Sequence, residues 1–309
     1  MNNDKALLEV IDMSVSFRMY EKGLKQYDMN VISNLSISVG RGEILAIVGS
    51  SGSGKSLLAH GVMGLLPENA TLTGNIIYDG VELTKERQDI LRGKKIALVP
   101  QSISYLDPLI KIGKQVQGTD KSVEAKRRQR ESFKRYDLCE NSEKLYPFQL
   151  SGGMARRAMV STADQNDVDL IIADEPTPGL DLAIAMKTLN YFREFANKGK
   201  AVILITHDID LAINVADRIA VFYAGTTVEI APVSDFQRVE ALRHPYTKAL
   251  FNALPQNGFQ SIEGFQPFGQ SMPKGCLFAP RCNAASKDCN QKIPMRELRN
   301  GMVRCINAT

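Results

Sequence analysis

Apolar and polar side chains alternate in two stretches between residues 7 and 39. The apolar positions are Leu8, Val10, Val15 and Phe17 in the first stretch and Leu35, Ile37 and Val39 in the second. Alternation with a period of two is typical of a strand that buries only one face. The pattern therefore predicts an antiparallel edge sheet in this part of the chain.

Four later apolar runs lack this alternation. They are Ile44–Val48, Leu170–Ala173, Val202–Ile205 and Ile219–Phe222, and segments of helical length separate them. Strands this apolar are covered on both faces, as in parallel sheets with helices on either side. The sequence thus predicts a parallel α/β core.

Two other regions differ from this core. From Gln101 to Leu150 the pattern becomes polar, charged and helical, which predicts an inserted helical subdomain at about residues 102–160. Beyond Ala231 the periodicity weakens, and Pro255–Gly275 is rich in Gly, Pro, Phe and Gln, as linkers are. We expect a domain over residues 1–235 and a C-terminal extension over 236–309 that ends in a small cysteine-bearing tail.

Composition narrows the class of protein. With 309 residues and 44% hydrophobic content the chain can bury a large core, and a net charge of +4 does not indicate nucleic-acid binding. One dense basic cluster, at residues 126–130, is interpreted as a solvated helix face, with contact to anionic lipid headgroups as the alternative. No apolar run reaches the roughly 20 residues of a membrane span, and the first residues lack a signal-peptide pattern. A cytosolic chain with reduced cysteines is expected.

The strongest motif follows the first buried strand. Its residues, which match G-x-x-x-x-G-K-[ST], are Gly49, Ser50, Ser51, Gly52, Ser53, Gly54, Lys55 and Ser56. The glycines allow backbone N–H groups to point at phosphate oxygens, and the next helix adds the positive end of its dipole. Lys55 is expected to reach the β- and γ-phosphates of a nucleotide, and Ser56 to bind Mg²⁺.

An acid pair ends the second buried strand. Asp174 and Glu175 follow four apolar residues. In a doubly wound sheet this end of the strands lies beside the phosphate-binding loop. Asp174 is predicted to hold the Mg²⁺ shell, and Glu175 to polarise the water that attacks the γ-phosphate.

A second anion-binding helix start is predicted at Ser151-Gly152-Gly153, within Leu150–Met154, where a serine cap precedes two glycines. One nucleotide does not need two such surfaces. The set resembles the ABC ATPases, P-loop NTPases in which the LSGG signature of one subunit covers the ATP of the other.

The resemblance implies further site residues. Gln101 resembles the Q-loop glutamine, which also reaches Mg²⁺, and Asp181 in Gly179-Leu180-Asp181 resembles the D-loop. His207 resembles the switch histidine that senses the γ-phosphate, with a purely structural role as the alternative. Phe17 is the candidate for stacking on adenine, although it could instead be a core residue.

A narrower resemblance comes from His244-Pro245-Tyr246-Thr247-Lys248-Ala249-Leu250 and the tail that follows. These are similar to the ATPases of oligopeptide and dipeptide permeases, whose relatives import nickel and other small solutes. The resemblance implies a second, different ATPase subunit, two transmembrane subunits and an extracytoplasmic substrate-binding protein. It places the chain at the cytoplasmic face of the membrane. Soluble ABC proteins of DNA repair or translation carry coiled-coil insertions or tandem cassettes, which this chain lacks, and the extension argues against an exporter.

Four of the five cysteines lie close together in the tail: Cys276, Cys282, Cys289 and Cys305. Their spacing includes no C-x-x-C pair, so scattered thiols, zinc and an iron–sulfur cluster all remain open. By resemblance, some peptide-permease ATPases bind a [4Fe–4S] cluster with such a quartet. A tail of about 35 residues is too short to bury its own core, so a metal would supply folding energy. Cys139 stands apart as an ordinary thiol.

Overall fold

The computed structural model describes residues 6–164, 167–269 and 272–309, and the chain divides into two compact units. Unit 1 comprises Met1–Gly40, Leu45–Thr84 and Thr206–Thr309, and unit 2 comprises Arg41–Ile44 and Lys85–Ile205. Each unit is described in turn.

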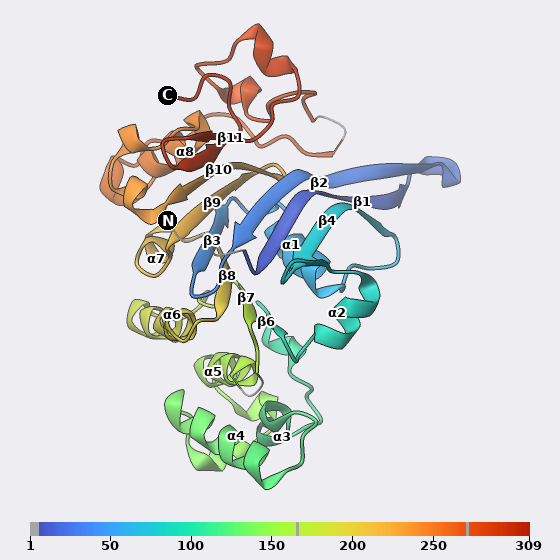
Figure 1. Cartoon of the computed structure of the whole chain (residues 1–309), viewed down its shortest axis with the longest axis vertical. Helices are drawn as coiled ribbons and strands as arrows, with labels where there is room; N and C mark the ends of the chain where they lie inside the picture. The colour runs from blue at the N-terminus through green and yellow to red at the C-terminus, as the bar shows by residue number, and fades with distance from the viewer. Residues whose placement is uncertain (1–5, 165–166, 270–271) are drawn as a thin grey trace. The chain divides into compact units, whose positions relative to one another are not determined.

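Unit 1 contains the predicted antiparallel sheet, shown in blue and cyan in Figure 1. Its strands, in the spatial order β2-β1-β4-β5, are β1 (Leu8–Tyr20), β2 (Gln26–Val39), β4 (Ala70–Tyr78) and β5 (Val81–Glu82). Val10 and Val15 are an odd number of residues apart, so a regular strand would place them on opposite faces. A register shift between Val10 and Met13, where Asp12 has a φ of 47°, lets both be buried on one face.

The remaining strands of unit 1 include the first buried apolar run. β3 (Ile44–Gly49) is parallel to β9 (Arg218–Tyr223), as expected, and β9 continues antiparallel into β10 (Thr226–Pro232). The tail adds β11 (Arg296–Leu298) and β12 (Gly301–Val303), and β12 pairs with β10. The helices are α1 (Lys55–Met63), α7 (Ile209–Ile213) and α8 (Pro245–Asn252).

Two arginines, the half-buried Arg304 and the buried Arg243, anchor the extension to the strands of unit 1. Arg304 donates hydrogen bonds to the carbonyl oxygens of Thr227, Ile293 and Asn34, at 3.1, 3.1 and 2.7 Å. Arg243 lies 3.2 Å from the buried carboxylate of Glu229 on β10. Because β12 also extends the sheet at β10, the tail shares the core of unit 1. The tail is too short to bury a core of its own, as expected, and its contacts with unit 1 supply part of the folding energy that was expected to come from a metal.

Unit 2 contains three parallel strands, β6 (Ile96–Val99), β7 (Leu170–Asp174) and β8 (Ala201–Thr206). Its helices are α2 (Lys85–Leu91), α3 (Ile112–Gln117), α4 (Val123–Arg135), α5 (Gly152–Ala163) and α6 (Leu182–Asn197). The predicted polar insertion is indeed helical, with short 3₁₀ turns between α4 and α5.

The basic cluster lies on α4 and is solvated. Arg127, Arg128 and Arg130 are exposed, and each forms an ion pair with a nearby carboxylate. This matches the solvated helix face that the sequence predicted. In the described part of the chain, none of the helices has the length and apolar character needed to cross a membrane.

Candidate functional site

The phosphate-binding loop of unit 1 joins β3 to α1 through two constrained glycines. A Cβ on Gly49 would lie 2.5 Å from the carbonyl oxygen of Phe222 on β9, so no larger residue fits there. Gly54 caps α1 with a φ of 89°, a left-handed conformation that favours glycine. The local sequence therefore sets the curled backbone that presents N–H groups at the start of α1.

Lys55 crosses this loop. Its side chain is buried, and Nζ donates to the carbonyl oxygens of Gly49 at 2.8 Å and Ser50 at 3.1 Å. Ser53 Oγ is also buried and has no hydrogen-bond partner among the described residues. A glycine cradle, a lysine ammonium and an unpartnered hydroxyl suit a phosphate group. Ser56 lies in the first turn of α1 and is partly exposed.

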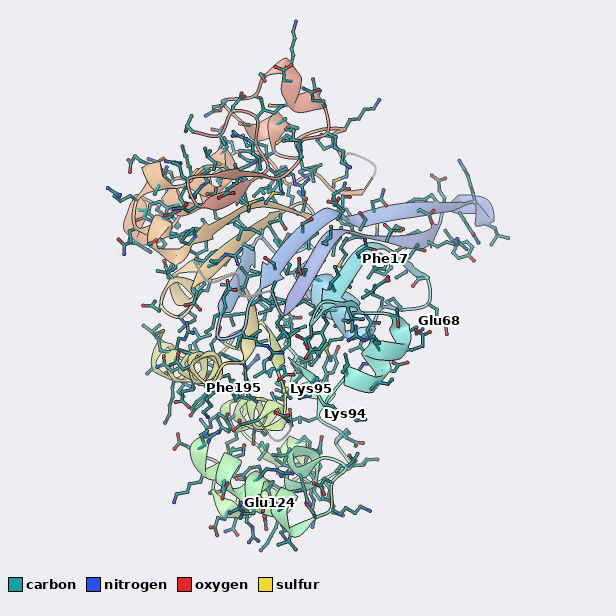
Figure 2. The ribbon with its side chains drawn as sticks, in the orientation of Figure 1. Phe17, Glu68, Lys94, Lys95, Glu124 and Phe195 are labelled. Atoms are coloured by element: carbon teal, nitrogen blue, oxygen red, sulfur yellow. The ribbon has the colours of Figure 1, made fainter. Side chains whose placement is uncertain are left out.

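Unit 1 also holds two of the candidates named by resemblance. Phe17 is half-buried on β1, opposite Met29 of β2 and Ala70 of β4 (Figure 2). Part of its ring is therefore accessible to a ligand. His207 is exposed and directly follows the last residue of β8. The next residue, Asp208, caps α7 by accepting from the Leu211 amide.

In unit 2 the acid pair ends β7, every residue of which is buried. Asp174 and Glu175 are 5% and 7% exposed. Glu175 has a φ of 47°, which is uncommon for a residue with a side chain, and its N–H donates to the Ile205 carbonyl oxygen at 2.9 Å. This hydrogen bond continues the β7–β8 ladder past Asp174 and fixes the backbone from which the carboxylate projects.

Sequence reasoning missed Arg156 on α5. Its Nη1 donates to the carbonyl oxygens of Gln101 at 3.1 Å and Glu175 at 3.2 Å. Burial lowers the Arg156 pKa, and the nearby Glu175 carboxylate opposes that shift. One guanidinium thus connects the segment after β6 with the acid pair. The Gln101 side chain is exposed.

Two helices of unit 2 begin at predicted site residues. Ser151 caps α5, its Oγ accepting from the Met154 N–H at 3.3 Å, and Gly152 has open space around its Cα. The predicted serine-capped helix start is confirmed. Asp181 caps α6 by accepting from the Ile184 N–H at 3.0 Å.

The four tail cysteines lie near one another in unit 1. The Cys276 N–H donates to the Cys289 carbonyl oxygen at 2.8 Å. Burial raises the pKa of the Cys276 and Cys282 thiols and raises that of Cys305 to about 11, and the neighbouring cysteine thiols add to these shifts. Across residues 6–164, 167–269 and 272–309, no three or more Cys, His, Asp or Glu side chains are placed to hold a metal ion. Cys139 is exposed on the other unit.

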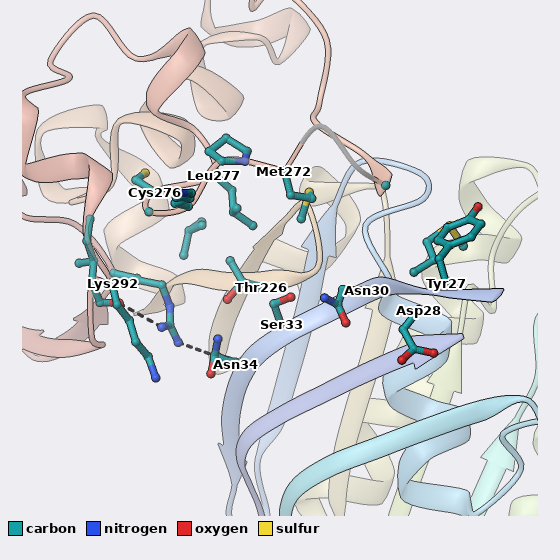
Figure 3. A pocket seen from close by; sticks show the side chains of 18 residues that line it. Tyr27, Asp28, Asn30, Ser33, Asn34, Thr226, Met272, Cys276, Leu277 and Lys292 are labelled. Atoms are coloured by element: carbon teal, nitrogen blue, oxygen red, sulfur yellow. Dashed lines mark hydrogen bonds between the residues drawn. The ribbon is translucent and has the colours of Figure 1, made fainter. Parts of the chain in front are cut away.

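A separate cavity of about 450 Å³ lies in unit 1 between β2, β10 and the tail (Figure 3). Its walls include Asn30, Ser33, Thr226, Cys276 and Lys292. None of the described residues that line it belongs to the phosphate-binding loop, and Phe17 is not among them. The cavity is therefore distinct from the candidate nucleotide residues.

Comparison with known protein families gives two matches. A sequence model described as ABC transporter matches residues 32–178. A second, described as the C-terminal region of oligopeptide/dipeptide transporters, matches residues 228–289. The first match contains the phosphate-binding loop, the LSGG segment and the acid pair. The second contains most of the extension.

Individual proteins and structures agree with these matches. The oligopeptide transport ATP-binding protein OppD of Salmonella typhimurium is 33% identical over 318 residues, which cover 96% of this chain and 92% of that protein. The dipeptide transport ATP-binding protein DppD of Haemophilus influenzae is 33% identical over 320 residues, 97% of this chain and 95% of that protein. A dimeric ATP-binding cassette solved in a post-hydrolysis state with ADP and Pi has a TM-score of 0.65 and 26% identity, covering 73% of this chain and 98% of that one.

Proposed function

The chain belongs to the ABC transporter family, in its oligopeptide and dipeptide transport branch, and from this premise we propose that it binds and hydrolyses ATP to power peptide uptake across the cytoplasmic membrane. The observation that carries the proposal is the glycine cradle crossed by Lys55, which suits a triphosphate. Import of nickel or another non-peptide solute is the second candidate, because this subunit itself does not contact the cargo.

The proposed roles in ATP chemistry follow from the donor groups present. The N–H groups of residues 49–56 and the Lys55 ammonium neutralise the phosphates, and Phe17 stacks on the adenine. Ser56, Asp174 and Gln101 carry the oxygen donors that Mg²⁺ prefers and would hold the ion. Bound Mg²⁺ would neutralise charge that develops on the phosphate oxygens. Glu175 orients and deprotonates the attacking water, and His207 contacts the γ-phosphate.

We also propose that the chain works in an assembly. Ser151, Gly152 and Gly153 present a helix start to the ATP of a second, different ATPase subunit, and Asp181 lies in the segment that contacts the same partner. Two transmembrane subunits and an extracytoplasmic substrate-binding protein complete the importer. The chain would then be a peripheral protein on the cytoplasmic side of the membrane.

For the extension we propose boundaries at residues 236–309, after a nucleotide-binding domain at 1–235 whose helical subdomain spans about 102–160. The four tail cysteines are proposed to bind a [4Fe–4S] cluster, with zinc as the alternative. Their chemistry supports this, since four mutually close thiols are the usual donor set of both centres. One zinc ion needs sulfurs at about 2.3 Å from a single point, and no group of described side chains has such an arrangement. The preference for the cluster over zinc rests on the resemblance to peptide-permease ATPases that bind a cluster with such a quartet.

Transport measurements in cells test the function. A strain that lacks this chain should lose uptake of a labelled peptide and regain it when the chain is restored. Unchanged peptide uptake together with lost uptake of radioactive nickel would replace peptide import by the second candidate. If neither uptake changes, while the purified chain still hydrolyses ATP with its partners, the cargo belongs to another class of solute.

A further inference from the structure

Two side chains of the extension bind Ser50, the second residue of the phosphate-binding loop. Ser50 Oγ donates a hydrogen bond of 2.6 Å to Oε1 of Gln266. The Tyr246 side chain also interacts with Ser50, and this interaction lowers the pKa of Tyr246 against the larger raising effect of burial. All three residues belong to unit 1, although Ser50 and Gln266 are 216 positions apart. Nothing in the phosphate-binding motif itself requires these contacts.

Tyr246 is held rigidly in place. Its ring is buried and packs on Tyr223 and Phe278, with centroids 4.4 and 5.3 Å away. Its N–H donates to Nδ1 of His244 at 3.0 Å, and the His244 N–H donates to the buried Glu229 carboxylate at 2.7 Å. The histidine is a helix cap, and burial lowers its pKa to about 3. The His-Pro-Tyr motif therefore fixes where the tyrosine hydroxyl lies.

The linker that carries Gln266 is fixed by a second set of hydrogen bonds, which Arg281 donates. Arg281 donates to the carbonyl oxygens of Glu263 at 2.7 Å and Ile262 at 3.0 Å, and to the Tyr223 hydroxyl at 3.1 Å. Its guanidinium also lies over the Tyr223 ring. Two residues of the linker, Ile262 and Glu263, are thus tied through Arg281 to the same aromatic cluster that supports Tyr246, and Gln266 lies three positions after Glu263.

Ser50 lies at a sensitive point of the loop. Lys55 Nζ donates to the Ser50 carbonyl oxygen, so the same residue contacts the lysine on one side and the extension on the other. We propose that Tyr246 and Gln266 are positioning residues that fix Ser50 and hold the phosphate-binding loop in its nucleotide-binding form. The extension thereby raises the affinity for ATP, because a pre-arranged loop loses less conformational freedom on binding. This inference rests on the proposed ATP-binding function.

Equilibrium binding of Mg·ATP to the full-length chain tests the inference with three single variants. Tyr246→Phe removes one hydroxyl and keeps the ring, Gln266→Ala removes the acceptor, and Gln260→Ala is the control on the same linker. Loss of one hydrogen bond of this kind corresponds to about a two- to tenfold weaker affinity. We expect that change for the first two variants, with an equal rise in KM and little change in kcat in the assembled transporter. The control should match the wild type.

A double-mutant cycle separates positioning from a merely structural role. If Gln266 acts through the Ser50 hydroxyl, Gln266→Ala should have no further effect on ATP affinity in a Ser50→Ala background, and Tyr246→Phe should lose the part of its effect that passes through that hydroxyl. Thermal melting of each variant checks that the fold is kept, and Gln266→Ala removes only a partly exposed side chain. Affinities equal to the wild type in both variants, or losses that add fully to that of Ser50→Ala, would overturn the inference alone. Failure of the wild-type chain to bind Mg·ATP would overturn the proposed function, and this inference with it.

Discussion

Glu175 occupies a backbone conformation that costs a non-glycine residue about 1–3 kcal/mol, and two hydrogen-bonding groups in unit 2 keep it there. The Glu175 N–H donates a hydrogen bond to the Ile205 carbonyl oxygen, and the Glu175 carbonyl oxygen accepts one from Arg156. A fixed backbone gives the carboxylate a fixed origin, as a general base requires. Glu175→Gln should keep ATP binding and lower hydrolysis by about 10²–10⁴-fold, because it removes the base and keeps the shape.

Single-turnover hydrolysis in the assembled transporter measures this effect. The matched control is Glu194→Gln, an exposed carboxylate on α6. The variant should also accumulate as a closed dimer with ATP. Hydrolysis at the wild-type rate by Glu175→Gln would remove the general-base assignment.

Lys55 differs from Glu175 because it is proposed to bind the phosphates of ATP, whereas Glu175 is proposed to act in hydrolysis. Its buried ammonium donates to the carbonyl oxygens of Gly49 and Ser50, and the charged oxygens of a triphosphate are stronger partners than neutral carbonyl groups. Lys55→Ala should weaken ATP affinity by at least about tenfold, since a hydrogen bond to a charged group contributes about 1.5–3 kcal/mol. Titration with a fluorescent ATP analogue measures it, with the exposed Lys94→Ala as control. Unchanged affinity would contradict the assignment.

Residues that act through contiguous motifs were predictable from the sequence, whereas residues that act through distant carbonyl groups were not. The phosphate-binding loop and the acid pair can be recognised in the sequence, because their chemistry needs adjacent residues in a fixed order. Arg156 contacts backbone atoms 55 and 19 positions away, and Gln266 contacts a serine 216 positions away. No local pattern encodes such pairs. The arginine lies three residues after the LSGG segment, which is the one sequence signal that could have drawn attention to it.

At the scale of elements, α5 and α4 begin in the same way, and only α5 belongs to the proposed contact with the ATP of the partner subunit. Ser151 caps α5 and Ser122 caps α4, with Oγ accepting the Met154 and Ala125 N–H groups at 3.3 and 3.0 Å. Ser151→Arg should leave ATP binding by the isolated subunit intact and suppress hydrolysis in the transporter, because the bulky cation blocks the helix start offered to the partner's ATP.

Ser122→Arg is a matched control for this prediction. It removes an equivalent cap, with a comparable cost of about 0.5–2 kcal/mol in stability, at a helix outside the signature. ATPase activity of the two assembled variants should therefore differ strongly while their melting temperatures fall by similar amounts. A collapse of ATP binding in the isolated Ser151→Arg subunit would instead place the serine in its own subunit's site.

The elements themselves were predicted best where both faces are buried. The four apolar runs correspond to β3, β7, β8 and β9 within one residue or so at each end. The strands of the tail were missed, because β11 and β12 have three residues each and owe their pairing to β10 rather than to their own periodicity. The bulge in β1 likewise depends on tertiary burial, which local alternation does not encode.

At the scale of the whole chain, the contacts of the tail with unit 1 reduce the folding energy that a metal at its cysteines has to supply. A stretch of about 35 residues was expected to need a metal for folding energy, yet β12 pairs with β10 and Arg304 binds three carbonyl groups of unit 1. Metal loss should therefore leave the nucleotide-binding part folded and able to bind ATP. Its effect is expected to stay within the segment that carries the thiols.

The corresponding prediction concerns the chain purified without oxygen. Cys276, Cys282, Cys289 and Cys305 should together hold one metal centre, with about four irons and four sulfides per chain if it is the proposed cluster and one zinc if it is not. Chemical analysis of iron, sulfide and zinc distinguishes these outcomes, and the brown absorption should disappear in Cys282→Ser.

Cys139→Ser is the control, because Cys139 is exposed and lies in the other unit. Both variants should still bind ATP, since the proposed phosphate-contacting residues precede Asp208. A metal-free protein whose four tail thiols all react with an alkylating reagent in the native state would contradict any metal centre, and the buried Cys289 and Cys305 make that reaction a stringent test.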